Sequence, residues 1–253
     1  MRALLFSVLV AISWMGSLPA HGEATLKLAV AANFARPLEK IAEQYEQRAS
    51  VKSVVTVASS GTLFAQIQHG ADVDVFFSAD SARPEALIDN NQVLAADVHT
   101  YAFGRLAYLD RSQASPSLND LKTFALSPGT RIAIANPRLA PYGQAAKDSL
   151  QQLTLWPQLS ARLIQGKNVL QAYQYYASGN IDRALVAWSL VHEKNTNVYL
   201  IPKKLHRSIE QKLAVTAREE NLNLARDFVE FVLSPEVQAT LSDWGYEPVS
   251  DNN

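Results

Sequence analysis

Two apolar runs near the start of the chain each stop at small polar residues. Residues 26–32 run into Asn33, and residues 54–58 run into Ser59-Ser60-Gly61-Thr62. Beyond each stop the apolar residues recur at the spacing of a helix face. The recurring residues are Leu38, Ile41, Ala42 and Tyr45 after the first run, and Leu63, Phe64 and Ile67 after the second. The pattern predicts a strand, a turn and a helix, twice in succession.

A helix N-terminus presents unpaired backbone N–H groups and a partial positive charge. Two such ends facing one crevice would bind an anion without any charged side chain. The simpler interpretation is that Asn33 and Ser60 are ordinary N-caps, which is the commonest use of these residue types. Either interpretation places a helix start at each turn.

Strands and helices continue to alternate along the rest of the chain. Apolar runs at 72–78, 101–109, 131–135, 184–188, 198–201 and 213–216 alternate with helical patterns at 84–88, from Ser117, at 142–153, at 168–177 and from Ser234-Pro235. Alternation of this kind indicates βαβ units and a mostly parallel sheet. The loop 136–143 again leads from a strand into a helix, and ligands of open α/β sheets bind outside the carboxyl ends of strands. We therefore expect two lobes that meet at such ends.

The first 24 residues have the pattern of a cleaved secretory signal peptide. Arg2 precedes an apolar stretch at 3–15, and small residues follow at Ala20, Gly22 and Ala24. This apolar stretch is shorter than the roughly 20 residues that span a bilayer. The pattern predicts an exported, periplasmic protein.

The remaining composition excludes several classes of function. The chain has 23 Lys and Arg against 24 Asp and Glu, so no nucleic-acid partner is expected. It has no cysteine, which excludes thiolate catalysis and thiolate metal sites. The histidines lack zinc-site spacing, and Ser60 lies outside a G-x-S-x-G motif. We expect no enzyme activity, no cofactor and no direct metal-ion ligands.

Several short motifs, in this order and spacing, resemble the periplasmic molybdate-binding proteins of ABC importers. They are residues 31–33, 58–63, 71–80, the 136–143 loop and 187–189, together with the signal peptide. The resemblance implies a type II periplasmic-binding-protein fold, in which two α/β lobes, each a mostly parallel sheet flanked by helices, are joined by two crossover strands. Lobe 1 would comprise residues 25–103 and 212–253, and lobe 2 residues 104–211.

The resemblance also implies the residues that hold the anion. They are the amide of Asn33, the hydroxyls of Ser60 and Tyr142, and the backbone N–H groups of Ser60, Val169 and the first turn, where Ala32 is a further candidate. Trp188 stands where the family has a tyrosine near a strand end, which leaves its contact in doubt because indole offers one N–H and no acceptor. The protein would act as a monomer that delivers its ligand to a membrane permease.

Molybdate is a fully deprotonated dianion, so a matching site needs only hydrogen-bond donors. Phosphate would also need an acceptor for its proton, and a buried polar group without a partner costs about 1 to 3 kcal/mol. Tungstate should bind like molybdate. The alternatives that stay open are another tetrahedral oxyanion, such as sulfate or thiosulfate, and a small carboxylate, for which an Arg would be expected.

Overall fold

The structure is a computed structural model, and it describes residues 24–247 and 249 apart from residues 130 and 194–196. The predicted signal peptide, residues 1–24, therefore lies outside the described residues except for Ala24. In the part of the chain that is described, no helix combines the length and the apolar character needed to cross a membrane.

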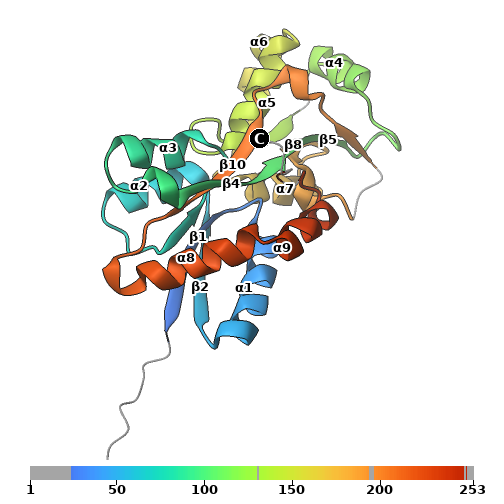
Figure 1. Cartoon of the computed structure of the whole chain (residues 1–253). Coiled ribbons are helices and arrows are strands. Elements are labelled where there is room, and N and C mark those ends of the chain that lie inside the picture. The colour runs from blue at the N-terminus through green and yellow to red at the C-terminus, as the bar shows by residue number, and fades with distance from the viewer. Residues whose placement is uncertain (1–23, 130, 194–196, 248, 250–253) are drawn as a thin grey trace, which may run out of the picture.

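Ten strands form two separate five-stranded sheets among the described residues (Figure 1). The first sheet, in the order β2-β1-β3-β10-β4, consists of β1 (Thr25–Ala31), β2 (Lys52–Ala58), β3 (Val75–Phe77), β10 (Ile209–Val215) and β4 (Val98–Gly104). The second, in the order β7-β6-β8-β5-β9, consists of β7 (Leu163–Gly166), β6 (Ile132–Ala135), β8 (Arg183–Ala187), β5 (Leu106–Asp110) and β9 (Val198–Leu200). In each sheet the first three strands pair in parallel, and the fourth pairs antiparallel with both the third and the fifth.

Helices flank both sheets, as the alternation along the chain predicts. We call the first sheet lobe 1, together with α1 (Ala35–Ala49), α2 (Ser60–Gln68), α3 (Ala82–Asp89), α8 (Glu219–Leu233) and α9 (Pro235–Thr240). We call the second sheet lobe 2, together with α4 (Leu118–Leu126), α5 (Pro141–Gln152), α6 (Trp156–Leu159) and α7 (Val169–Ala177). Figure 1 shows α1 and α8 near β1 and β2, and α4, α5 and α6 at the other end of the molecule.

Strand β1 shows why the sheet of lobe 1 is covered on both faces. Leu28 and Val30 belong to the core beneath α1 and α8, whereas Ala29 between them belongs to the core beneath α2 and α3. Successive side chains of a strand point to opposite faces, so a continuous apolar run indicates burial on both sides. The uninterrupted run at 26–32 is therefore the expected signature of this strand.

The apolar run at 101–109 is divided between the two lobes. Gly104 ends β4 in the first sheet, and Leu106 begins β5 in the second. The chain thus crosses from lobe 1 to lobe 2 at Arg105, and it returns between Leu200 at the end of β9 and Ile209 at the start of β10. Because β4 and β10 pair with each other, both crossings lie side by side.

Three helix starts predicted from the sequence are confirmed by side-chain caps in the structure. Ser117 and Asp120 form a complete capping box at α4, Asn168 caps α7, and Ser234 caps α9 with Pro235 at its first position. At α2 the cap is Ser59, whose Oγ accepts from the backbone N–H of Thr62 at 3.3 Å. Asn33 and Ser60 are therefore not N-caps, and another role is open to both.

Candidate functional site

A small enclosed cavity lies between the lobes, at the carboxyl ends of parallel strands from both sheets. Its volume of about 10 Å³ is close to the least that admits one water molecule. It is lined by Ala31, Ala32, Asn33, Ser59, Ser60, Ala79, Ala140, Pro141, Tyr142, Asn168 and Val169. No lining residue carries a charge, so a ligand in this cavity would be held by neutral groups.

Four helix N-termini surround this cavity. The turn after β1 leads into α1, and the turn after β2 leads into α2, both in lobe 1. In lobe 2 the loop after β6 leads into α5, and the turn after β7 leads into α7. Each N-terminus contributes a partial positive charge, so the four together favour an anion in the cavity.

Several backbone N–H groups at these turns have no acceptor among the described residues. They belong to Asn33 and to the first residues of α2 and α7, Ser60 and Val169. The N–H of Ala32 differs, because it donates to the carbonyl of Ala58 at 2.9 Å and continues the β1–β2 ladder. Ala32 therefore contributes a wall of the cavity, and its backbone N–H is already used.

The hydroxyl of Ser60 is oriented to donate into the cavity. Ser60 is fully buried, and its Oγ accepts a hydrogen bond from the backbone N–H of Ala79 at 2.9 Å. The oxygen already accepts, so the hydroxyl proton is left for a further acceptor. An anion in the cavity would supply that acceptor.

The side-chain amide of Asn33 departs from the expected role. Its Nδ2 donates to Oε1 of Gln211 at 2.7 Å and to the hydroxyl of Tyr246 at 3.0 Å. An amide nitrogen has two protons, and both are used here, so neither is directed at a ligand. The donor that Asn33 offers to the cavity is its backbone N–H.

Tyr142 reaches the cavity from the second position of α5. Its side chain is 1 % exposed, and its hydroxyl accepts from Nε2 of Gln211 at 3.4 Å. Burial raises the pKa of the Tyr142 phenol well above its usual 10.0, so the group stays protonated at neutral pH. A Cβ at Gly104 would overlap this hydroxyl, so only glycine fits at the crossing of the chain.

Gln211 was missed by sequence reasoning, although it is fully buried beside two predicted site residues. It lies on β10 between Glu210 and Lys212. A single polar residue within an apolar run would have indicated a buried polar group. Gln211 does not stand out in this way, because both of its neighbours in the sequence are charged. Gln211 lies on the same face of β10 as the buried Ile209 and Leu213, because alternate side chains of a strand point to the same side.

Trp188 lies outside the cavity. It follows the end of β8, as Ala79 follows β3, but its indole packs on Gly245 and its ring centroid lies 6.0 Å from that of His192. The structure thus brings together the predicted residues Ala32, Asn33, Ser60, Tyr142 and Val169, and leaves Trp188 in a contact between lobe 2 and the C-terminal segment.

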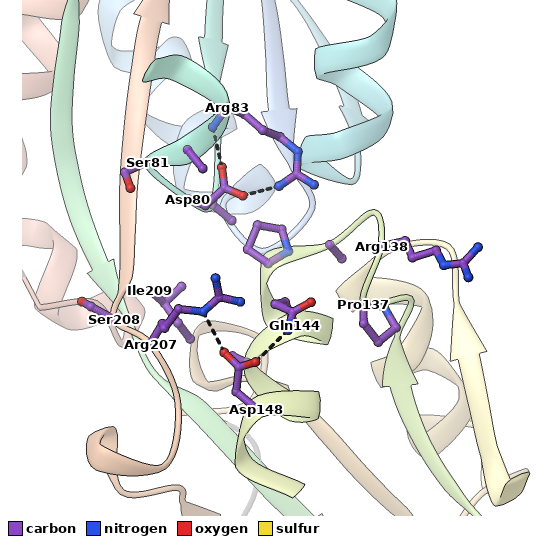
Figure 2. A pocket seen from close by; sticks show the side chains of 15 residues that line it. Asp80, Ser81, Arg83, Pro137, Arg138, Gln144, Asp148, Arg207, Ser208 and Ile209 are labelled. Carbon is purple, nitrogen blue, oxygen red and sulfur yellow. Dashed lines mark hydrogen bonds and ion pairs between the residues drawn. The ribbon is translucent and has the colours of Figure 1, made fainter. Parts of the chain in front are cut away.

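A larger groove of about 550 Å³ opens beside the cavity and shares Ala79, Ala140 and Pro141 with it. Its charged groups occur in pairs: Asp80 with Arg83 on lobe 1, and Asp148 with Arg207 on the other side (Figure 2). In Figure 2 the side chain of Arg138 points away from these pairs. The groove is the open part of the boundary between the lobes.

Contacts on the opposite side hold the lobes together. The Oγ of Ser189 in lobe 2 donates to the backbone carbonyl of Asn33 in lobe 1 at 3.1 Å. Glu247 accepts from Arg105 at 3.0 Å and from Lys203 at 2.5 Å, so one carboxylate joins the C-terminal segment, the crossing and lobe 2. Hydrogen bonds from these cations hold the pKa of Glu247 below its usual 4.5 against the opposing effect of burial. These contacts join the two lobes beside the crossing and the C-terminal segment.

The two-lobed fold and an interlobe anion cavity define a solute-binding protein. The family described as bacterial extracellular solute-binding protein matches residues 26–247, and the chain belongs to that family. The chain is 30% identical over 234 residues to the molybdate-binding protein ModA of Azotobacter vinelandii, covering 88% of this chain and 90% of that protein. It is 30% identical over 220 residues to ModA of Rhodobacter capsulatus, covering 86% of each chain.

A solved structure agrees with these relatives. The periplasmic molybdate-binding protein of Azotobacter vinelandii superposes with a TM-score of 0.80 at 32% identity, over 89% of this chain and all of that one. Members of the solute-binding family are binding proteins and not enzymes. The fold predicted from the sequence is therefore confirmed.

Proposed function

We propose that this protein binds molybdate or tungstate in the cavity between its lobes and delivers the anion to the permease of an ABC importer. The observation that carries the proposal is the convergence of four helix N-termini on an enclosed cavity without a charged residue. The names of the relatives supply the particular oxyanion, because they are molybdate-binding proteins.

The groups at the cavity match a fully deprotonated tetrahedral dianion. The backbone N–H groups of Asn33, Ser60 and Val169 lack acceptors, and the hydroxyls of Ser60 and Tyr142 each accept from a protein donor. All of them can therefore donate to the ligand. Hydrogen phosphate would bring a proton that finds no carboxylate among the lining residues. An amino acid would lack an Arg for its carboxylate.

Sulfate and thiosulfate are the second candidates, because the same donors would satisfy them. Sulfate has the charge and shape of molybdate and is smaller. The uncharged lining of the cavity does not by itself distinguish the two ions. Discrimination then depends on whether the donors of both lobes can reach the smaller ion at once.

The predicted signal peptide and the extracellular solute-binding family support a periplasmic location. We infer that the mature chain acts there as a monomer, because both halves of the cavity come from one chain.

Titration calorimetry of the mature protein with molybdate, tungstate, sulfate and phosphate tests the proposal. We expect tight binding of molybdate and tungstate and weak or no binding of phosphate. Thermal unfolding is an independent readout, since a ligand at 100 times its Kd stabilises the native state by about 2.7 kcal/mol. Tighter binding of sulfate than of molybdate would favour the second candidate, and equal binding of phosphate would contradict a site made of donors.

A further inference from the structure

A continuous chain of buried hydrogen bonds lies behind the cavity. It runs from Tyr246 in the C-terminal segment to Asn33 in lobe 1, then to Gln211 on the crossover strand β10, and ends at Tyr142 in lobe 2. Each of these side chains is at most 3 % exposed. The chain therefore connects both lobes and the crossing without contact with bulk water.

In each of these hydrogen bonds, which group donates and which accepts follows from the backbone carbonyl of Asn33, beside Tyr246. The hydroxyl of Tyr246 donates its one proton to the carbonyl of Asn33 at 2.7 Å, and a carbonyl can only accept. The same hydroxyl, 3.0 Å from the amide of Asn33, can then only accept. The side-chain amide of Asn33 must therefore place Nδ2 beside the hydroxyl of Tyr246. The second proton of Nδ2 points to Gln211.

The same reasoning fixes the donor and acceptor in the next hydrogen bond, which joins β10 to lobe 2. Oε1 of Gln211 accepts from Asn33 at 2.7 Å, so the other end of this amide, Nε2, faces the hydroxyl of Tyr142. An amide nitrogen can only donate, so the phenol oxygen accepts. The phenol proton of Tyr142 is thereby free to donate into the cavity. The remaining neighbour, Tyr101, donates to the same Oε1 of Gln211 at 3.0 Å and therefore supports the same orientation of this amide.

We propose that Gln211 and Tyr246 are positioning residues that make Tyr142 a hydrogen-bond donor toward the bound oxyanion. This inference rests on the proposed function and adds to it a reason for anion preference. With the opposite amide orientation, Tyr142 would donate to Gln211 and present a lone pair to the ligand. A lone pair suits a protonated anion such as hydrogen phosphate and repels a dianion without protons.

Two matched substitutions separate this role from simple packing. Tyr246→Phe removes a hydroxyl that sets the direction, and Tyr108→Phe removes a buried hydroxyl that donates to Asp110 and contacts no member of this chain of hydrogen bonds. We expect Tyr246→Phe to weaken molybdate binding about tenfold, the order of one hydrogen bond to a charged group, and Tyr108→Phe to leave it within about twofold. Calorimetry gives the Kd values, and thermal unfolding of the unliganded variants reports any loss of stability separately.

The second measurement is the molybdate affinity of Tyr246→Phe made in the background of Tyr142→Phe. If Tyr246 acts through the phenol proton, Tyr246→Phe should weaken binding by less than about twofold once that proton is absent. The preference for molybdate over hydrogen phosphate should also fall in Tyr246→Phe and not in Tyr108→Phe. If Tyr246→Phe does not fold, Gln211→Met in the same two backgrounds tests the same chain.

The outcomes distinguish this inference from the proposed function. A wild-type protein that binds no oxyanion overturns both. The inference alone is overturned if the wild-type protein binds molybdate while Tyr246→Phe and Tyr108→Phe have equal effects. It is also overturned if the loss from Tyr246→Phe persists without the phenol of Tyr142.

Discussion

The backbone N–H of Gly61 in lobe 1 donates to the carbonyl oxygen of Leu139 in lobe 2 at 2.8 Å. Gly61 is the second residue of α2, directly after Ser60 at the cavity. A Cβ at this position would lie 2.8 Å from that carbonyl oxygen and 2.9 Å from Nη2 of Arg83. The lobes can approach this closely only because the residue is glycine.

We expect Gly61→Ala to hinder closure and to weaken molybdate binding by tenfold or more, about 1.4 kcal/mol. The unliganded protein should lose no stability, because alanine is favoured over glycine within a helix by about 1 kcal/mol. Calorimetry and thermal unfolding measure the two effects. Ala65→Ser, at an exposed position of the same helix, is the matched control and should bind normally. Unchanged affinity in Gly61→Ala would show that this contact is not needed for binding.

The neighbouring serines should have different roles. Ser60→Ala removes a hydroxyl whose proton is free for the anion, and it should weaken binding by about 1.5 to 3 kcal/mol. Ser59→Ala removes the cap of α2 and should mainly lower the free energy of unfolding, by about 0.5 to 2 kcal/mol. The two variants are compared by calorimetry and by urea unfolding. A greater loss of affinity in Ser59→Ala would reverse the assignment.

Tyr142→Phe should weaken molybdate binding by about 1.5 to 3 kcal/mol, because it removes one donor to a charged ligand. Trp188→Phe should leave affinity nearly unchanged, since the indole packs on Gly245 outside the cavity. Calorimetric titration of both variants with molybdate shows which side chain contributes to affinity. Normal binding by Tyr142→Phe together with lost binding by Trp188→Phe would mean that the donor lies at the end of β8.

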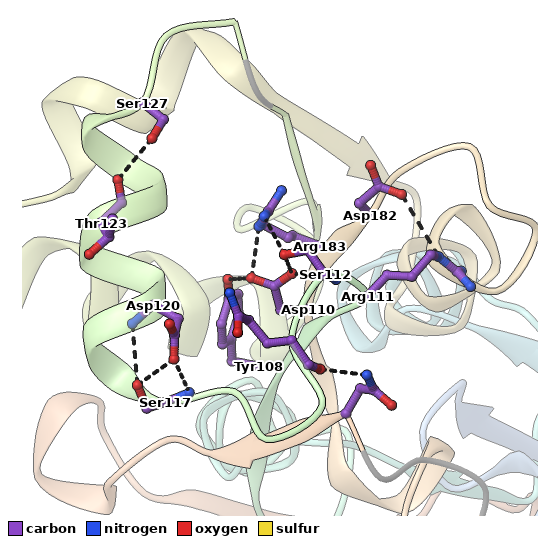
Figure 3. A network of polar contacts seen from close by, with 12 residues as sticks. Tyr108, Asp110, Arg111, Ser112, Ser117, Asp120, Thr123, Ser127, Asp182 and Arg183 are labelled. Atoms are coloured by element: carbon purple, nitrogen blue, oxygen red, sulfur yellow. Dashed lines mark hydrogen bonds and ion pairs between the residues drawn. The ribbon is translucent and has the colours of Figure 1, made fainter.

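A buried carboxylate stabilises lobe 2 away from the cavity. Asp110 accepts from Arg183 at 2.8 Å, from Tyr108 at 2.8 Å and from Ser112 at 2.6 Å, as Figure 3 shows. Burial alone would raise the pKa of Asp110, but the hydrogen bonds from Ser112 and Tyr108 and the charge of Arg183 hold it below its usual 3.8. The ionised form is therefore favoured by folding.

A carboxylate with a lowered pKa stabilises the folded state above its unfolded pKa, and this stabilisation is lost as the pH falls through the folded value. We expect the free energy of unfolding to fall below about pH 4 in the wild type and to depend less on pH in Asp110→Asn. At pH 7 Asp110→Asn should be less stable by about 3 kcal/mol, because Arg183 loses its partner. Urea unfolding between pH 3 and 7 gives both quantities. If the free energy of unfolding depends on pH in the same way in the wild type and in Asp110→Asn, Asp110 does not cause the loss of stability in acid.

The sequence revealed most of the fold because its strands are buried on both faces and its helices begin at recognisable caps. The turns at Asn33 and Ser60 were visible for the same reason. Two strand boundaries were not visible in the apolar pattern. The run at 101–109 has the pattern of one segment, and only the resemblance placed a lobe boundary inside it; in the structure Gly104 divides the run between the two sheets. The run at 72–78 forms only β3 (Val75–Phe77). The buried side chain of Asp74 accepts from the backbone N–H of Lys27 at 2.8 Å, which ends the regular ladder there.

Roles within the site were harder to predict than its location. The resemblance implied that the side-chain amide of Asn33 is a donor to the anion, but its partners Gln211 and Tyr246 lie 178 and 213 residues away along the chain. Trp188 was a candidate because it stands where the family has a tyrosine near a strand end. Its exclusion depends on the C-terminal segment, which brings Gly245 against the indole. Such contacts between distant segments leave no periodic signal in the sequence.

Lobe 2 is a single uninterrupted segment that leaves lobe 1 beside the point where it returns. Asn33 and Ser60 thus belong to one half of the cavity, and Tyr142 and Val169 to the other. Neither half alone surrounds an anion. A recombination event with both ends at β4 and β10 would exchange half of the cavity and leave the other half intact. The chemistry of one face of the ligand can therefore change in evolution by inheritance of a whole lobe, while the opposite face keeps its ancestral contacts.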